Sequence, residues 1–370
     1  MWPNELTDAL LAFIAADAGA DEALDAQFND LALAIFAHQF QHNRAYQQFC
    51  RSRGRTPATL RHWHELPAVP VNAFKEVTLS AVPPAECERV FMTSGTTREV
   101  KGQHFHPNLT VWNASMRRHF AACLSLLPLR MAVLFPTEAE MPNSSLAHYL
   151  HLARQDHGLP GSAYLWGEQG VDTAALCAWV REAQAADEPV ALLGATYSFV
   201  HALDALTDAS LDLRLPCGSW LLDTGGFKGR SREVPIDAFY ADLSTRFGVP
   251  RDRCINMYGM TELSSQCYDA GNAVVPALKR PPHWMRTRAV DPLSGESVPD
   301  GQPGILVHTD LANLNSVTTL MTEDVGVVRD GGFQLIGRAE GAQAKGCSLA
   351  VEDFVQAARP GHIVGQERWE

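Results

Sequence analysis

The sequence predicts an α/β protein built on a mostly parallel sheet that is flanked by helices. The main observation is an alternation of short β-rich runs with helical stretches. This alternation extends from about residue 88 to residue 258 and is typical of βαβ units. The second observation is the composition, since 46% hydrophobic and 19% charged residues exclude a largely disordered chain. At 370 residues, the chain is long enough for two domains, or for one α/β unit with additions.

The amino-terminal part, residues 1–65, is predicted to be largely helical. Between residues 4 and 56, apolar side chains such as Leu10, Phe13 and Ile14 recur at roughly helical spacing, and β-branched residues are few. The run 66–71 contains two prolines, and a proline favours extended geometry in the residue before it. This run is therefore predicted to link the helical part to the main body.

Residues 66–300 are predicted to form the α/β core. Its expected strands cover residues 90–93, 131–135, 163–166, 190–193, 219–222 and 254–257. Its expected helices cover residues 109–127, 144–155, 173–185, 198–206 and 237–246. Ligands bind outside the carboxyl ends of parallel strands. Three of the expected strands run directly into polar loops that contain glycine, so we expect a ligand site at these loops.

Residues 301–336 are predicted to form a small β subdomain. The runs 304–309, 326–328 and 333–336 are typical of short antiparallel strands, and Arg329-Asp330-Gly331-Gly332 supplies the residues of a hairpin turn. Residues 337–370 are predicted to be a short tail that resembles a hinge.

Charge, cysteine content and the amino terminus limit the possible functions. The formal net charge of −12 argues against nucleic acid as the main partner, because phosphate neutralisation needs clustered Lys and Arg. The amino terminus has no signal-peptide pattern, and every apolar run is too short to span a bilayer. The eight cysteines include no C-x-x-C pair, which favours reduced thiols. The sequence therefore predicts a soluble cytoplasmic protein with no membrane span.

The first polar loop is Thr93-Ser94-Gly95-Thr96-Thr97, which follows the expected strand 90–93. Hydroxyl groups and backbone N–H groups beside a glycine that can adopt positive φ form a cradle for an anion. The loop is therefore a candidate phosphate site. An ordinary polar turn remains the alternative.

The second polar loop contains Gly225 and Gly226, which follow the expected strand 219–222. Paired glycines let a flat ring or a phosphate approach the backbone closely, although they also form ordinary turns.

The third polar loop, Tyr258-Gly259-Met260-Thr261-Glu262, follows the expected strand 254–257. Its aromatic ring can stack on a base, its hydroxyl can bond a phosphate, and its carboxylate can hold Mg²⁺ together with phosphate oxygens. The alternative is that Tyr258 belongs to the core and Glu262 is a solvated residue at the start of a helix.

Two further elements contain charged or metal-ligating side chains. Asp324 precedes a predicted turn, where it can accept from two ribose hydroxyls or cap the turn, and Arg338 can add a cation. The histidine pairs 62/64 and 104/106 have a spacing of two residues. No third ligand is apparent for either pair, so a metal role is disfavoured.

In this order and spacing, the loops resemble those of the adenylate-forming enzymes. Thr93–Thr97 looks like their phosphate loop, and Gly225-Gly226 looks like their adenine-side glycines. The run Tyr258–Glu262 looks like their nucleotide and metal motif. Asp324 looks like their ribose-binding aspartate, and Gly337-Arg338 looks like the motif that precedes their hinge.

Further runs narrow the resemblance to the LuxE-type acyl-protein synthetases, the fatty-acid-activating component of the bacterial bioluminescence fatty-acid reductase. These runs are His64-Glu65-Leu66-Pro67, Pro142-Asn143-Ser144-Ser145-Leu146, Gly225-Gly226-Phe227-Lys228-Gly229-Arg230 and Lys345-Gly346-Cys347-Ser348-Leu349. The resemblance extends from about residue 60 to residue 355. It implies a large domain like that of adenylate-forming enzymes, with a truncated carboxyl-terminal lid.

The resemblance also implies an activity. A fatty or other carboxylic acid is activated with ATP and Mg²⁺ to an acyl-adenylate. The acyl group then passes to a protein cysteine as a thioester, and from there to an acyl reductase partner.

Each loop receives a role from this resemblance. The β- and γ-phosphates are held by Thr93–Thr97 and Lys101, the α-phosphate by Thr261, and Mg²⁺ by Glu262. The ribose is fixed by Asp324 and Arg338. The adenine is flanked by Tyr258, Gly259, Gly225 and Gly226. The acyl group is expected along residues 190–200, which include Tyr197 and Phe199.

Cys347 is expected to be the acyl acceptor. Lys345 is expected to help lower the pKa of this thiol, and Gly346 is expected to leave the surrounding loop mobile. A structural thiol in the core is the alternative.

Two features depart from the superfamily pattern. Arg98 stands after the second threonine of the phosphate loop, where glycine is usual. The superfamily's lid carries a lysine that supports adenylation, but only 33 residues follow Gly337 in this chain. Lys345 or Lys228 is therefore expected to take the place of that lysine.

Two other functions remain open. One is an acyl- or aryl-coenzyme A ligase of the phenylacetate type, whose product would require coenzyme A. The other is a non-catalytic subunit that binds an adenylate and scaffolds a reductase partner.

Overall fold

The chain forms two compact units in the computed structural model, which describes residues 3–17, 22–94, 100–124, 128–208, 213–226 and 231–358. Unit 1 comprises Met1–Ser115, Thr261–Ser265 and Pro281–Glu370. Unit 2 comprises Met116–Met260 and Gln266–Arg280. The five residues Thr261–Ser265 therefore interrupt unit 2 and belong to unit 1. They include Thr261 and Glu262 of the predicted nucleotide and metal motif.

Unit 2 is built on a six-stranded sheet with the order β11-β10-β9-β8-β4-β5. Its strands are β4 (Arg130–Leu134), β5 (Ala163–Tyr164), β8 (Val190–Ala195), β9 (Trp220–Thr224), β10 (Cys254–Tyr258) and β11 (Cys267–Tyr268). Among the described residues, the pairs from β5 to β10 are parallel, and β11 is antiparallel to β10. The prediction of a mostly parallel sheet is confirmed for this unit.

The helices of unit 2 begin and end where local sequence signals favour it. These helices are α6 (Ser145–His157), α7 (Thr173–Ala186), α8 (Thr196–Asp208) and α9 (Ile236–Phe247). Ser144 and Asp172 each cap the following helix by accepting a backbone N–H, and Gly248, with φ +66°, ends α9. Apolar side chains from α7, α8 and α9 pack with β8 in one buried cluster.

Three short strands and one 3₁₀ helix complete the description of this part of the chain. The strands β6 (Trp166–Gly167) and β7 (Gly170–Val171) pair antiparallel. The strand β12 spans Leu278–Lys279, and the 3₁₀ helix η3 spans Arg251–Arg253. Helix α5 (Thr110–Leu124) begins in unit 1 and continues into unit 2.

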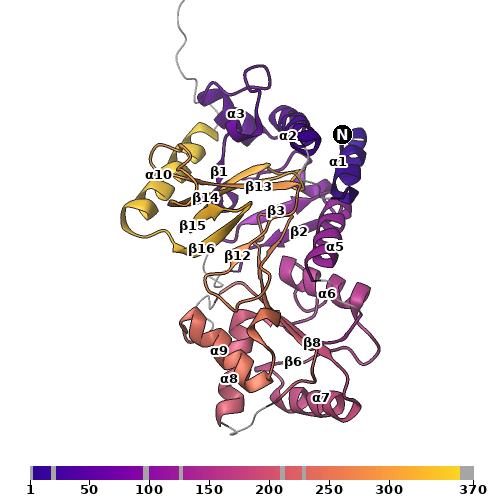
Figure 1. The fold of residues 1–370 in the computed structure, drawn as a ribbon. Helices are drawn as coiled ribbons and strands as arrows, with labels where there is room; N and C mark the ends of the chain where they lie inside the picture. Colours follow the sequence, from indigo (N-terminus) through magenta and orange to yellow (C-terminus); the bar gives the residue numbers. More distant parts are fainter. Residues whose placement is uncertain are drawn as a thin grey trace, which may run out of the picture. The chain divides into compact units, whose positions relative to one another are not determined.

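Unit 1 contains an antiparallel sheet near its carboxyl terminus (Figure 1). Four of its strands are β13 (Met285–Val290), β14 (Pro303–Asp310), β15 (Thr319–Arg329) and β16 (Gly332–Arg338), each antiparallel to the next. The short strand β1 (Val69–Pro70) pairs parallel with β15. The predicted antiparallel strands after residue 300 are confirmed, although β15 begins earlier than expected.

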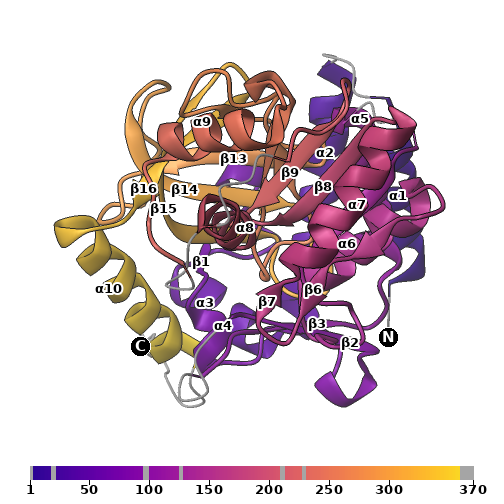
Figure 2. The ribbon, with the colours of Figure 1, turned by 90° about the horizontal axis from the view of Figure 1, so that it is seen from below.

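Most of the other elements of unit 1 are helices. They are α1 (Asn4–Ala15), α2 (Glu22–His42), α3 (Arg44–Ser52), α4 (Ala73–Glu76), α10 (Gly341–Ala358) and the 3₁₀ helices η1 (Trp63–Glu65) and η2 (Pro84–Glu86). The helices α1, α2 and α3 confirm the expected helical character of residues 4–56. Helix α10 packs against α3 and β1, and Figure 2 shows α10 beside α3.

Three expectations about local structure are corrected. The expected strand 90–93 is β2 (Arg89–Met92), which pairs antiparallel with β3 (Gln103–His106) in unit 1 and is not part of the parallel sheet. Asp324 lies inside β15 and not before a turn. Cys347 lies in helix α10 and not in a mobile loop.

The four predicted segments of the chain do not coincide with the two units. The segments 1–65, 301–336 and 337–370 all fall in unit 1, whereas 66–300 is divided between the units. The three boundaries between these four segments remain predictions. In the described part of the chain, no helix is both long enough and apolar enough to cross a membrane.

Candidate active site

Two of the predicted loops are neighbours at the carboxyl edge of the parallel sheet in unit 2. Strands β9 and β10 pair directly, with Thr224 opposite Met257. The Thr224 hydroxyl donates to the Met257 carbonyl oxygen at 2.9 Å. The loops that begin at Gly225 and after Tyr258 therefore start side by side, because parallel neighbouring strands end at the same edge.

The first of these loops begins with a glycine pair. Gly225 has φ +77°, a conformation that side chains with a Cβ rarely adopt. A Cβ added at Gly226 would meet no atom within 4 Å. Tyr258, by contrast, is only 8% exposed, which is expected if its side chain belongs to the core. Its stacking on a base remains a prediction.

A buried carboxylate holds the end of β9. Asp223 is 1% exposed and accepts from Thr196 Oγ1 at 2.7 Å, Tyr240 OH at 2.9 Å and Asn256 Nδ2 at 2.9 Å. Burial raises the pKa of Asp223 to about 6, and these donors oppose the rise. Because Asp223 is two residues before Gly225, the three bonds restrain the backbone that leads into the glycine loop.

The same network extends to a buried ion pair. Lys279 Nζ lies 2.6 Å from Asp269 Oδ2, and both side chains are almost inaccessible to solvent. Lys279 also donates to the carbonyl oxygen of Asn256 at 3.1 Å and to its side-chain oxygen. The network therefore connects both strands that end in predicted loops. Asp223, Asp269 and Lys279 are not among the predicted site residues, because nothing in their local sequence distinguishes them from ordinary polar residues.

In unit 1, Glu262 lies near the base of the predicted phosphate loop. Thr93 and Gly102 close this base with a backbone bond of 3.0 Å from Thr93 N to Gly102 O. A second bond of 2.9 Å joins Gly102 N to Thr93 Oγ1. A Cβ added at Gly102 would lie 3.1 Å from Thr93 Cγ2 and 3.5 Å from Glu262 Oε1. The structure thus brings Thr93 and Glu262 together around Gly102.

The remaining residues of the phosphate-loop prediction are described only in part. Ser94 and Lys101 are exposed at the two ends of the loop. Gly95, Thr96 and Thr97 lie outside the described residues, and so does Lys228.

The segment Thr261–Ser265 is held by side chains that sequence reasoning missed. Asp310, at the end of β14, accepts the backbone N–H groups of Ser264 and Ser265 at 3.0 and 2.9 Å. Asn313 Nδ2 donates to the Glu262 carbonyl oxygen at 2.9 Å. Burial raises the pKa of Asp310 to about 6. Asp310 and Asn313 follow a predicted strand, and that position is the signal by which they could have been found.

The predicted ribose residues lie opposite each other on neighbouring strands. Asp324 in β15 pairs with Arg338 in β16, next to a shift of register. Arg338 Nε lies 3.8 Å from Asp324 Oδ1, and a terminal guanidinium nitrogen lies 2.7 Å from Glu323 Oε2. The Arg338 side chain is 72% exposed and that of Asp324 is 18% exposed. The structure therefore brings these two residues together and adds Glu323 as a partner.

Cys347 lies between helix α10 and the antiparallel sheet. It is 3% exposed and packs in a cluster with Val290, Ile305, Val307, Met321 and Val325. Burial, together with the nearby carboxylate of Glu323, raises the pKa of the Cys347 thiol.

The expectation that Lys345 lowers the pKa of Cys347 is wrong for this arrangement. Lys345 is exposed on α10, and two residues along a helix correspond to a rotation of about 200°. The lysine and the thiol therefore face different directions. The acceptor role of Cys347 remains a prediction.

Metal binding by protein side chains alone finds no support in the described residues. No group of three or more His, Cys, Asp or Glu side chains there is arranged to hold a metal ion. A single carboxylate such as Glu262 is nevertheless compatible with Mg²⁺, which is usually bound by one or two carboxylates together with substrate phosphates.

Comparison with solved structures shows the fold. The open conformation of 2-hydroxyisobutyryl-CoA ligase in complex with 2-HIB-AMP and CoA matches with a TM-score of 0.63 and 16% identity. The match covers 88% of this chain and 75% of that one. The same ligase in its postadenylation state with 2-HIB-AMP matches with a TM-score of 0.62 and 15% identity, over 88% of this chain and 72% of that one.

Sequence comparisons identify the family. A long-chain-fatty-acid–luciferin-component ligase of Vibrio harveyi is 21% identical over 349 residues, which cover 90% of this chain and 89% of that protein. A protein of the same name from Aliivibrio fischeri is 26% identical over 87 residues, or 21% of this chain and 23% of that protein. The family model described as acyl-protein synthetase, LuxE, matches residues 169–355, just over half of the chain. The chain therefore belongs to the LuxE family of acyl-protein synthetases and is an acyl ligase.

Proposed function

We propose that this enzyme activates a fatty acid with ATP and then transfers the acyl group to one of its own cysteines. The observation that carries the proposal is the gathering of predicted nucleotide residues within each unit. Gly225 follows the end of β9, Tyr258 is the last residue of the neighbouring strand β10, and Glu262 lies beside the base of the phosphate loop. The continuous run Tyr258–Glu262 connects the two groups along the chain.

The residues present fit a nucleotide and Mg²⁺ on two counts. Gly225 and Gly226 carry no Cβ atom, and the space where a Cβ at Gly226 would lie holds no atom within 4 Å, which suits the close approach of an adenine ring. The side chain of Thr93 accepts the Gly102 N–H, which leaves its hydroxyl proton for a phosphate oxygen. Thr261 would contact the α-phosphate. Mg²⁺, held by Glu262, would neutralise charge on the phosphates.

The first proposed step joins the acid to the nucleotide. A carboxylate oxygen forms a bond to the α-phosphorus, and the bond from that phosphorus to the bridging oxygen breaks, so pyrophosphate leaves with the electron pair. Hydroxyl and N–H donors of the phosphate loop stabilise the developing negative charge. Lys101 is exposed at the end of this loop and supplies a cation. Lys345 or Lys228 would substitute for the lid lysine.

The ribose is proposed to lie at the pair formed by Asp324 and Arg338. The Asp324 carboxylate is partly exposed and can accept from two hydroxyl groups. Arg338 already bonds Glu323, which restrains its long side chain before the nucleotide arrives.

The acyl group is proposed to lie along an aromatic cluster in unit 2. The ring centroids of Phe135 and Tyr197 are 6.5 Å apart, and those of Trp166 and Tyr197 are 6.4 Å apart. Phe135 and Tyr197 follow the carboxyl ends of β4 and β8, where a substrate of a parallel sheet binds. Tyr197 and Phe135 are buried, at 5% and 3% exposed, but lie outside the core cluster that contains Phe199, so the acyl group is proposed to contact Tyr197 and not Phe199.

The second proposed step forms a thioester on Cys347. The thiol first loses its proton to solvent, the thiolate sulfur then bonds to the carbonyl carbon, and the bond from that carbon to AMP breaks. Because Cys347 is buried and its pKa is raised, α10 must move from the sheet before this step. An acyl reductase is the proposed partner that consumes the thioester, and the proposed location is the cytoplasm.

The test is incubation with ATP, Mg²⁺ and labelled fatty acids of several chain lengths. We expect label that stays on the denatured protein, that neutral hydroxylamine removes, and that is lost in Cys347→Ala. The matched control is Cys177→Ala, which removes another buried helical thiol and should keep the label.

Other outcomes would favour the two rival functions. A product that requires coenzyme A and survives Cys347→Ser would indicate a coenzyme A ligase. ATP binding without pyrophosphate release, with any acid tested, would indicate a scaffold subunit.

A further inference from the structure

His104, in strand β3, bridges two loops of unit 1. It is 1% exposed. Its Nδ1 lies 2.9 Å from the Thr261 carbonyl oxygen, and its Nε2 lies 3.0 Å from Ser316 Oγ. Thr261 is 157 positions away along the chain, so the bond connects strand β3 to the segment that carries the predicted nucleotide motif.

The two partners determine the tautomer of the ring. A carbonyl oxygen can only accept, so Nδ1 must carry the proton and donate to Thr261. Nε2 then accepts, and the Ser316 hydroxyl donates to it. Burial lowers the pKa of His104 to about 4, so the ring is neutral at neutral pH and both bonds keep these directions.

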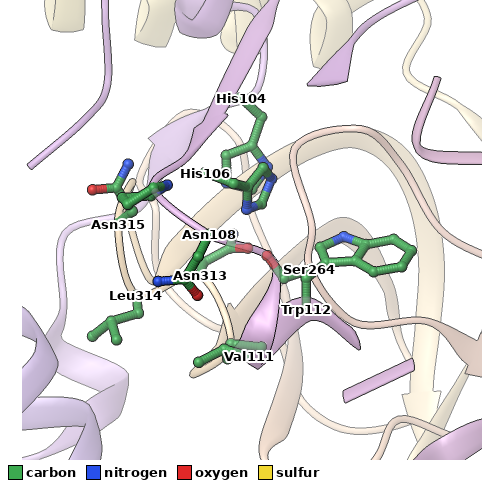
Figure 3. A pocket seen from close by; sticks show the side chains of 11 residues that line it. His104, His106, Asn108, Val111, Trp112, Ser264, Asn313, Leu314 and Asn315 are labelled. Carbon is green, nitrogen blue, oxygen red and sulfur yellow. The ribbon is translucent and has the colours of Figure 1, made fainter. Parts of the chain in front are cut away.

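The ring is also restrained by its neighbours. Its centroid lies 4.2 Å from that of His106 and 5.8 Å from that of Phe74, with the Phe74 ring edge-on. Figure 3 shows His104 and His106 together above a small pocket that Asn313 and Ser264 also line. The packing holds Nδ1 in the direction of Thr261.

The Thr261 carbonyl is one of several backbone groups of this segment that side chains hold. Asn313 holds the next carbonyl, that of Glu262, and Asp310 holds the N–H groups of Ser264 and Ser265. The peptide between Thr261 and Glu262 begins with the carbonyl that His104 bonds. Loss of this bond would free that peptide while the downstream bonds persist.

We infer that His104 is a positioning residue that fixes the peptide between Thr261 and Glu262 for the nucleotide reaction. This inference rests on the proposed function, because it uses the roles assigned there to the Thr261 hydroxyl and the Glu262 carboxylate. His104 acts through that peptide. By holding this peptide, His104 fixes the position of the Thr261 hydroxyl relative to the Glu262 carboxylate. The hydroxyl can then contact the α-phosphate while the carboxylate holds the metal.

Two substitutions distinguish the role of Nδ1 from that of Nε2 in the His104 ring. In His104→Asn the amide nitrogen takes the place of Nδ1 and keeps a donor for Thr261. In His104→Gln the amide lies one bond further from the backbone, at the place of Nε2, and the donor to Thr261 is lost. Both variants remove the ring, so their packing losses are similar and their difference reports the Thr261 bond.

The first readout is fatty-acid-dependent exchange of pyrophosphate into ATP at varied Mg²⁺. We expect kcat to fall about tenfold more in His104→Gln than in His104→Asn, as for one lost hydrogen bond of roughly 1.4 kcal/mol. The Mg²⁺ concentration at half-maximal rate should rise in His104→Gln alone. Equal kcat and equal Mg²⁺ dependence in the two variants would overturn the inference.

The second readout needs no activity. Hydrogen exchange in the peptides that cover residues 259–268 should be faster in His104→Gln than in His104→Asn. If the wild type shows no pyrophosphate exchange with any acid, the proposed function fails, and this measurement still decides whether His104 holds the segment. If pyrophosphate exchange is present but the variants do not differ in either readout, only the role of His104 fails.

A third variant covers the case in which both His104 variants fail to fold. Ser316→Ala keeps the ring and removes the hydroxyl that donates to Nε2, so the ring loses the restraint on its tautomer and orientation. We expect a kcat two- to threefold below wild type and faster hydrogen exchange in residues 259–268. Wild-type values of both would overturn the inference.

Discussion

The buried pair of Lys279 and Asp269 provides a stringent test of the structure of unit 2. Lys279 Nζ lies 2.6 Å from Asp269 Oδ2, and it also donates to the backbone and side-chain oxygens of Asn256. Three acceptors therefore surround an ammonium group that has three N–H donors. Asp269 in turn accepts the backbone N–H groups of Asn256 and Gly271.

We predict that Lys279→Met destabilises the protein by about 3 kcal/mol. Removal of one partner of a buried ion pair leaves an uncompensated charge and costs about 3–5 kcal/mol. Asp269 keeps its hydrogen bonds to Asn256, Gly271 and Asn272, which favours the lower end of this range. Methionine fills most of the space of the lysine stem, so little is added by a cavity.

The assay is urea unfolding at pH 7, followed by circular dichroism, with the double variant Lys279→Met/Asp269→Asn beside the single one. The double variant should be about 1–2 kcal/mol more stable than the single one, because it buries no unpaired charge. Arg181→Met is the control, since it removes an exposed cation from the same unit. It should change stability by less than about 0.5 kcal/mol.

The result that would refute this reasoning is a loss below about 1 kcal/mol in Lys279→Met, the range of exposed ion pairs. A double variant that is no more stable than the single one would also refute it. Either result would mean that Asp269 and Lys279 are solvated in the folded protein.

Three further predictions concern the candidate site. Gly102→Ala places a methyl group 3.1 Å from Thr93 Cγ2 and 3.5 Å from Glu262 Oε1. It should cost about 1–3 kcal/mol of stability and also slow pyrophosphate exchange, and an unchanged rate would show that the base of the loop plays no part. Arg338→Ala should raise the KM for ATP with a stability change below about 1 kcal/mol, because its ion pairs are exposed; an unchanged KM would contradict the ribose assignment. Burial raises the pKa of Asp223 from 3.8 to about 6. Its stabilising contribution is therefore full below pH 3.8 and is lost as pH rises through 6, by about 3 kcal/mol in total. Urea midpoints at pH 4 and pH 7 should show a smaller loss of stability in Asp223→Asn than in the wild type, and an equal loss would count against the raised pKa.

The position of Cys347 sets a condition on the proposed transfer. The thiol is on α10 and packs against side chains of the antiparallel sheet, and its pKa is raised and not lowered. A thiol in this state is a poor nucleophile. If Cys347 is the acceptor, α10 must therefore move before acyl transfer, and a substitution that loosens α10 should expose the thiol to alkylating reagents.

The sequence by itself determined the features that depend on near neighbours in the chain. The alternation of runs between residues 88 and 258 predicted the parallel sheet. Of the three loops predicted at its edge, the one that begins at Thr93 follows β2 in unit 1 instead, and the other two begin at that edge, at Gly225 and after Tyr258. The confirmed predictions succeed because strand and helix periodicity, and the direction of parallel strands, are local properties.

Only the tertiary structure decided which distant side chains hold those loops. His104 bonds a carbonyl 157 positions away, and Asp310 bonds N–H groups 45 and 46 positions away. It also decided that Cys347 is buried in a helix, that Asp324 lies within β15, and that Thr261–Ser265 belong to unit 1. Such pairings depend on how whole elements pack against one another. The residues next to each partner in the sequence therefore do not predict which distant residue it will contact.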